Sequence, residues 1–151
     1  MQRDRDELGR PRNARPRDAL GRPLPRDASH ELKHEPDPKT PEEALQRGIV
    51  LFNEGRFFEA HEMWEFGWHP APEPERDFWQ GIIQVAVGFT HFQRSNPKGA
   101  ITLLERGANR LSKYGRMHNG VPVRDIEAAA RAAIEEIKRF GLEASPVPPT
   151  I

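Results

Sequence analysis

Apolar residues recur every three to four positions through most of residues 41–140, which is the spacing of amphipathic helices. No stretch alternates apolar and polar residues with the period of two that is typical of a strand. The pattern therefore predicts an all-α fold: a single five-helix domain, built of helical hairpins, over residues 38–142. We place the helices at about 41–54, 56–68, 75–94, 97–114 and 124–140.

Capping residues mark most of the helix ends. Thr40 and Asn96 are suited to N-caps, and each is followed by a proline, which fits the first helical position. Glu43 completes a capping box with Thr40. Gly55 and Gly141 follow the first and last helices, where glycine ends a helix at low cost.

The two ends of the chain have a different composition. The 15 prolines gather there and around residues 70–74. We therefore expect residues 1–37 to form a disordered Pro/Arg-rich arm and residues 143–151 to form a loose tail.

The arm is basic. Residues 1–26 carry a net charge of +4 and the rest of the chain −4, and RDELGRP at 5–11 recurs as RDALGRP at 17–23. A solvated arm is the favoured interpretation, because Asp is interleaved with Arg and dilutes the field. A weaker alternative is an arm that binds nucleic acid or an acidic partner.

Composition also excludes several classes of protein. The chain has no cysteine, which excludes disulfides, thiol nucleophiles and Cys-ligated metal sites. No apolar stretch approaches the roughly 20 residues that span a bilayer, and the N-terminus has no apolar signal region. We expect a cytoplasmic protein without membrane segments.

Polar residues form stripes on two of the most apolar helices. On a helical wheel, FFEAHEMWEFGWH at 57–69 has an aromatic stripe, including Trp64 and Trp68, bordered by His61, Glu62 and Glu65. In the third helix Gln80, Gln84 and His91 share one sector, with Arg76 and Arg94 near its ends. Buried polar groups need partners, so we expect these stripes to face each other, with Gly81 and Gly88 allowing close approach.

The motifs in these helices resemble a known family. FNxGxFFEAHExWE, then FWQGIIQ with His91, then RxNPxGA, are similar to the family named domain of unknown function 309, over about residues 44–112. The resemblance implies a helical fold. It also indicates which residues are characteristic of the family, but it implies no activity. These residues are Glu59, His61, Glu62, Trp64, Glu65, Trp68, Gln80, Gln84, His91, Arg94 and Asn96.

The polar stripes leave two interpretations open. In the first, His61, Glu65 and His91 bind a divalent metal (Zn, Mn or Fe), with Glu62 as a general base of hydrolysis. Trp68, Arg76, Gln80, Gln84 and Arg94 then bind a small ligand. In the second, the chain is a non-enzymatic helical module that interacts with a protein partner, and the polar layer is structural. The sequence does not decide between an enzyme and a scaffold.

Overall fold

The computed structural model describes residues 4–5, 11–12 and 36–151. Residues 36–151 form five α-helices, so the all-α prediction is confirmed. The predicted arm falls almost entirely outside the described residues. Of it, the structure gives the antiparallel pair of two-residue strands β1 (Asp4–Arg5) and β2 (Pro11–Arg12). The helices are α1 (Pro41–Asn53), α2 (Phe57–Trp68), α3 (Glu73–Gln93), α4 (Pro97–Leu111) and α5 (Val123–Phe140).

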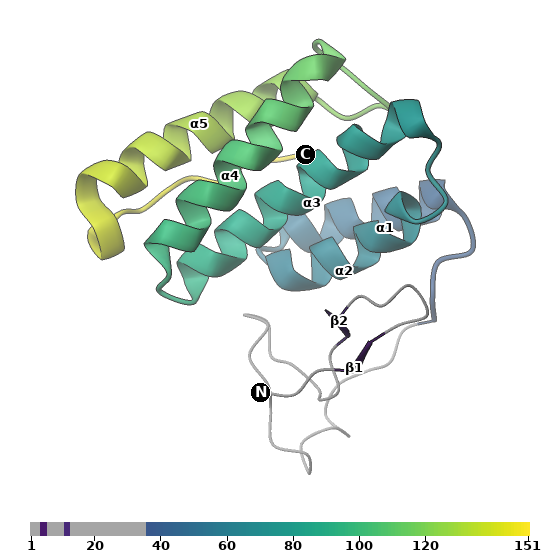
Figure 1. Ribbon diagram of the computed structural model, residues 1–151, viewed down its shortest axis with the longest axis horizontal. Helices are drawn as coiled ribbons and strands as arrows, with labels where there is room; N and C mark the ends of the chain where they lie inside the picture. Colours follow the sequence, from purple (N-terminus) through teal and green to yellow (C-terminus); the bar gives the residue numbers. More distant parts are fainter. Residues whose placement is uncertain (1–3, 6–10, 13–35) are drawn as a thin grey trace.

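Helix α3 is the central element of the bundle (Figure 1). The α1–α2 hairpin packs on one side of it and the α4–α5 hairpin on the other. This position explains the apolar character of α3, since most of its residues between Phe78 and Thr90 are buried. A polar residue in this buried stretch, such as Gln84, therefore lies close to a neighbouring helix.

The predicted caps are confirmed at α1 and α4. Thr40 Oγ1 accepts a hydrogen bond from the Glu43 N–H at 3.1 Å, and Asn96 Oδ1 accepts one from the Gly99 N–H at 3.0 Å. The Glu43 carboxylate accepts from the Lys39 N–H at 2.8 Å, one residue before the position that a capping box predicts.

Helix α3 begins two residues earlier than predicted, at Glu73. Pro72 is its N-cap and Pro74 lies in its first turn, where the missing N–H costs no intrahelical bond. The extra half-turn brings Glu73 onto the helix surface near the end of α2. Gly55 and Gly141 have φ of +81° and +57°, which supports their predicted role as helix stops.

The glycines of α3 pack against α4. A Cβ on Gly81 would lie 2.8 Å from the Leu111 side chain and 3.3 Å from the Gly107 carbonyl oxygen, and one on Gly88 would lie 2.6 Å from Leu104. The prediction that they let α2 approach is therefore wrong. Periodicity places a glycine on a helix face but does not say which neighbour that face meets.

The last residues of the chain are held to α1. Asn53 Nδ2 donates to the Ile151 carbonyl at 3.0 Å, and the Ile151 N–H donates to Asn53 Oδ1 at 2.9 Å. Ala144 is buried, and Ile151 packs against the core. The expected loose tail thus has specific contacts at its final residue, although residues 144–151 form no helix or strand.

Candidate functional site

His61 and Glu65 interact within α2. His61 Nε2 lies 3.5 Å from Glu65 Oε1, one turn further along the helix, and its Nδ1 contacts the Phe58 carbonyl oxygen. The side chain of His61 is 15% exposed, whereas Glu62 lies on the exposed face of the helix. The two side chains therefore occupy different environments, although they are neighbours in sequence.

His91 lies at the end of α3 and faces the start of α4. Its Nδ1 is 3.2 Å from Asn96 Nδ2, and its ring lies 3.0 Å from the position of a Cβ on Gly99. Burial lowers the pKa of His91, and the nearby Arg94 guanidinium lowers it further. The neutral imidazole is thus favoured at physiological pH.

The predicted metal site is not supported. Within residues 36–151 no three His, Asp or Glu side chains come together in a group that could hold a metal ion. His61 and Glu65 form a pair on α2, and His91 turns toward the residues that begin α4. Among the described residues, the contacts of His91 thus lead to a different helix from that of His61 and Glu65.

Two residues of α3, Asp77 and Gln84, are bound by Arg110 on α4, which was not among the predicted site residues. Arg110 Nε donates to Gln84 Oε1 at 3.1 Å, and Arg110 Nη1 forms an ion pair with Asp77. Lys113 Nζ lies 2.5 Å from Asp77 Oδ2. Lys113 and Arg110 lower the pKa of Asp77, against the opposing effect of burial. The partner of Gln84 is thus on α4, instead of the expected glutamate on α2.

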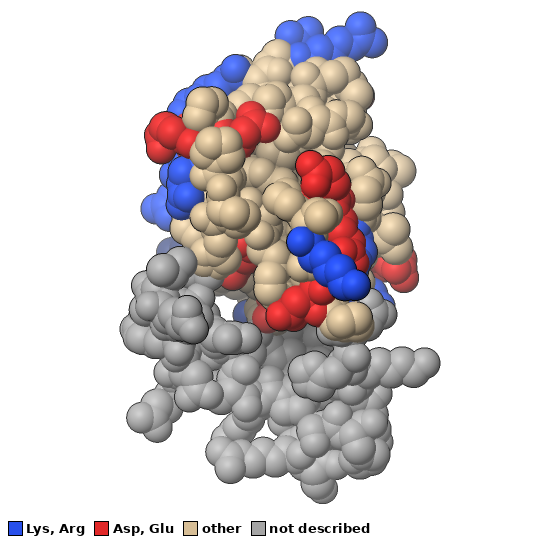
Figure 2. Space-filling view, turned by 90° about the vertical axis from the view of Figure 1, so that its right-hand side faces the viewer, with Lys and Arg blue, Asp and Glu red and all other residues tan. Residues whose placement is uncertain are grey.

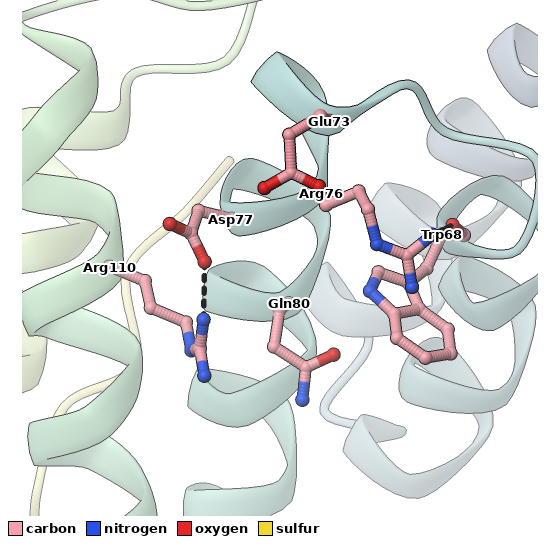
Figure 3. Close-up of a pocket in the computed structure, with 6 residues that line it drawn as sticks. All are labelled: Trp68, Glu73, Arg76, Asp77, Gln80 and Arg110. Atoms are coloured by element: carbon pink, nitrogen blue, oxygen red, sulfur yellow. Dashed lines mark hydrogen bonds and ion pairs between the residues drawn. The ribbon is translucent and has the colours of Figure 1, made fainter.

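A pocket of about 260 Å³ opens beside this network (Figure 3). Arg110 and Asp77 line one side, Arg76 and Trp68 line the other, and the Gln80 side chain lies between them. The lining residues come from α2, α3 and α4, and they include Glu73 at the start of α3. The structure therefore brings together three of the predicted binding residues, Trp68, Arg76 and Gln80.

Arg76 is held against Trp68. Its guanidinium carbon lies 4.4 Å from the centre of the indole ring, and Nη1 donates to the Trp68 carbonyl oxygen at 3.4 Å. In contrast, Arg94 lies at the other end of α3, where its guanidinium carbon is 5.1 Å from the centre of the Phe58 ring. The two arginines of the predicted site are thus separated by the length of the helix.

His118, to which the sequence analysis gives no role, fixes the loop between α4 and α5. Its Nε2 is 2.7 Å from Glu75 Oε2, and its ring packs on Phe78 and Tyr114 with centroid distances of 4.9 Å and 4.6 Å. Tyr114 also donates a hydrogen bond to the Pro74 carbonyl oxygen at 2.8 Å. These contacts join the loop to the first turns of α3, on which Glu73 and Arg76 lie.

Charges of both signs are mixed on the face of the molecule that Figure 2 shows. Figure 2 shows acidic side chains next to basic ones, with uncharged residues over much of the rest of that face. Among the described residues of this face, such mixing gives no broad positive field of the kind that attracts a nucleic-acid backbone. None of the helices in residues 36–151 is long and apolar enough to cross a membrane.

Most of the residues that line the pocket lie in a segment that matches a known protein family. Residues 45–103 match the family described as Domain of unknown function (DUF309). The uncharacterized protein YpuF of Bacillus subtilis (strain 168) is 40% identical over 58 residues, which cover 37% of this chain and 33% of that protein. The match thus spans about a third of this relative's length. No solved structure matches the chain significantly.

The matched segment includes Trp68, Arg76 and Gln80, and it ends before Arg110. It also contains the EAHEMWE and QGIIQ motifs on which the resemblance rests. The match to the domain of unknown function 309 thus covers residues 45–103, and it is the same family that these motifs resemble.

Proposed function

We propose that this protein is a helical binding module whose pocket between α2, α3 and α4 holds a small charged ligand through Trp68, Arg76 and Gln80. The observation that carries the proposal is the set of contacts that Arg76 makes. Its guanidinium is held over the Trp68 ring at 4.4 Å. Within the described part of the chain it forms no ion pair with a carboxylate.

An arginine held in this way is suited to binding. Its position over the indole reduces the side-chain freedom that a ligand would otherwise have to restrict. A guanidinium presents several N–H donors in one plane, which fit the oxygens of a carboxylate or phosphate. The Gln80 amide, which has no hydrogen-bond partner among the described residues, adds donors and an acceptor beside it.

The residues of the pocket favour binding over hydrolysis. Its lining contains no Ser, Thr, His or Lys, so Glu73 and Asp77 are the only side chains in it that could act as nucleophiles. Asp77 has a lowered pKa because Lys113 and Arg110 stabilise its charged form, which makes it a weak base. Glu62, the predicted general base, is on the exposed face of α2 and does not line the pocket.

A structural role for part of the polar layer is the second candidate, and one observation favours it. Arg110 on α4 binds both Asp77 and Gln84 on α3 across the interface between these helices. Groups that are already paired with each other fix the register of two helices. We assign this role to the α3–α4 network, and the binding role to the pocket mouth around Arg76.

Indole N–H resonances provide the test. The chain has three tryptophans, and of these Trp68 alone lines the pocket. Trp64 is buried and donates to the Leu45 carbonyl at 3.1 Å, so it serves as an internal reference. Small anions, cations and zwitterions, added singly to ¹⁵N-labelled protein, should include at least one class that shifts the Trp68 resonance and leaves Trp64 unchanged. The proposal fails if no class shifts Trp68.

A further inference from the structure

The charges that line the pocket fall into two groups. Asp77 and Arg110 are paired with each other, and Lys113 adds a second cation to Asp77. Glu73 and Arg76 also line the pocket, but neither forms an ion pair with another described residue. The pocket thus offers one anion and one cation to a ligand.

Glu73 and Arg76 are three residues apart on α3, a spacing at which opposite charges usually pair on a helix surface. Here the Arg76 side chain turns toward Trp68 instead, and Figure 3 shows the Glu73 carboxylate between Asp77 and the Arg76 side chain. Gln80 lies one turn further along α3 from Arg76, between the two sides of the pocket. A carboxylate bound at Arg76 would therefore have an amide donor nearby.

We propose that the ligand is a free α-amino acid. Its carboxylate binds Arg76 and Gln80, its ammonium group binds Glu73, and its side chain lies near the Trp68 indole. This inference rests on the proposed binding function of the pocket, whose ligand class it specifies. A volume of about 260 Å³ is just below the range that is usual for drug-sized ligands, and therefore fits a molecule of this size.

The charges explain why a zwitterion fits better than a simple ion. A monoanion at Arg76 would leave Glu73 uncompensated beside it, and like charges in a binding site select against a partner. A monocation at Glu73 would meet the same penalty from Arg76. A molecule that carries both charged groups on one carbon satisfies both residues, since hydrogen bonds to charged groups are among the stronger polar contacts.

The experiment is a titration of the full chain, observed through the Trp68 and Trp64 indole resonances. The standard L-amino acids are added singly, and the one with the largest Trp68 shift is compared with two analogues. One analogue lacks only the amino group, and the other lacks only the carboxylate. We expect each analogue to bind at least about tenfold more weakly than the amino acid, because each loses one charged contact.

Two variants assign the charges to residues. Arg76→Gln should weaken binding of the amino acid about tenfold or more, and so should Glu73→Gln. The Glu73 variant should bind the deaminated analogue at least as well as the parent protein does, because repulsion is removed. Arg124→Gln, exposed at the start of α5, and Glu42→Gln, exposed in the first turn of α1, are matched controls that should bind like the parent.

The outcomes separate this inference from the proposed function. If the deaminated analogue binds as tightly as the amino acid, or if a simple anion or cation shifts Trp68 and no amino acid does, the zwitterion inference is overturned and the binding function stands. If Glu73→Gln binds the amino acid like the parent protein, the assignment of the ammonium group to Glu73 is overturned. If neither amino acids nor simple ions shift Trp68, both proposals fail.

Discussion

Two regions along the same helix use their polar residues differently. At the α3–α4 interface, Asp77 and Gln84 are bound by Arg110, and Lys113 adds to the charge on Asp77. At the pocket mouth near α2, Arg76 contacts an indole ring and a backbone carbonyl, with no carboxylate partner among the described residues. One polar stripe can therefore stabilise the fold toward α4, while on its other side Arg76 keeps donors that we propose bind a ligand.

Backbone packing supports this division. A Cβ on Gly107 would lie 2.8 Å from the Gly81 carbonyl oxygen and 2.8 Å from Val85 Cγ2, so α3 and α4 touch nearly backbone to backbone. Arg110 lies less than one turn from Gly107 on α4, and this close contact sets its distance to Asp77 and Gln84. The α3–α4 network is therefore positioned by rigid elements.

Gly107→Ala should give the largest effect. The added Cβ meets a backbone oxygen that cannot move without displacing α3, so we expect a loss of about 2 kcal/mol in the free energy of unfolding. Urea denaturation measures it. An open position would behave in the opposite way, because Gly→Ala in a helix usually stabilises by roughly 0.5–1 kcal/mol. A more stable variant would therefore show that the two helices are not in close contact.

Asp77→Asn should have a smaller effect. Removing the carboxylate that pairs with Arg110 and Lys113 should lower the free energy of unfolding at neutral pH by roughly 0.5–1 kcal/mol, because these ion pairs are partly exposed. Urea midpoints of the parent and the variant, measured across a pH series, give this difference.

The effect should also depend on pH. The pKa of Asp77 is lowered in the folded protein, so the unfolded chain takes up a proton first as the pH falls. The contribution of Asp77 is therefore complete above its ordinary pKa of 3.8, and is lost as the pH falls below that value toward the lowered pKa. The difference between parent and variant should shrink in this window. A difference that stays constant through it would mean that Asp77 does not contribute through its charge.

A chelator should give the smallest effect, which is none. Because His91 contacts Asn96 at the start of α4 instead of joining His61 and Glu65, we expect the melting temperature in EDTA to equal that without it. Differential scanning calorimetry of protein purified without a polyhistidine tag measures this. A fall in the melting temperature would restore the metal interpretation of His61 and Glu65.

The sequence was sufficient to predict the helices, because caps act locally. Thr40 and Asn96 accept bonds from residues three positions along the chain, and Gly55 and Gly141 adopt the positive φ that ends a helix. Trp68, Arg76 and Gln80 were also predicted as binding residues, and all three line the pocket.

The partners of the α3 stripe could not be predicted in the same way. A helical wheel places Gln84 and Gly81 on a face, but the packing of three helices decides whether that face meets α2 or α4. Arg110 lies on a helix with many charged residues, so its sequence context does not distinguish it from an ordinary surface arginine. The sequence feature that could have indicated its role is Gly107, three residues before it, because glycines on two helices allow those helices to approach closely.

The division of the α3 polar stripe into a structural part and a binding part is tested most directly by Arg76→Gln. Its urea midpoint and its Trp68 response to amino acids are measured on the same sample, beside Gly107→Ala. We predict a free energy of unfolding within about 1 kcal/mol of the parent protein, since the half-buried Arg76 loses only its contact with Trp68, together with loss of the Trp68 response. An Arg76→Gln protein as unstable as Gly107→Ala, with the Trp68 response retained, would contradict the account and place Arg76 in the structural network.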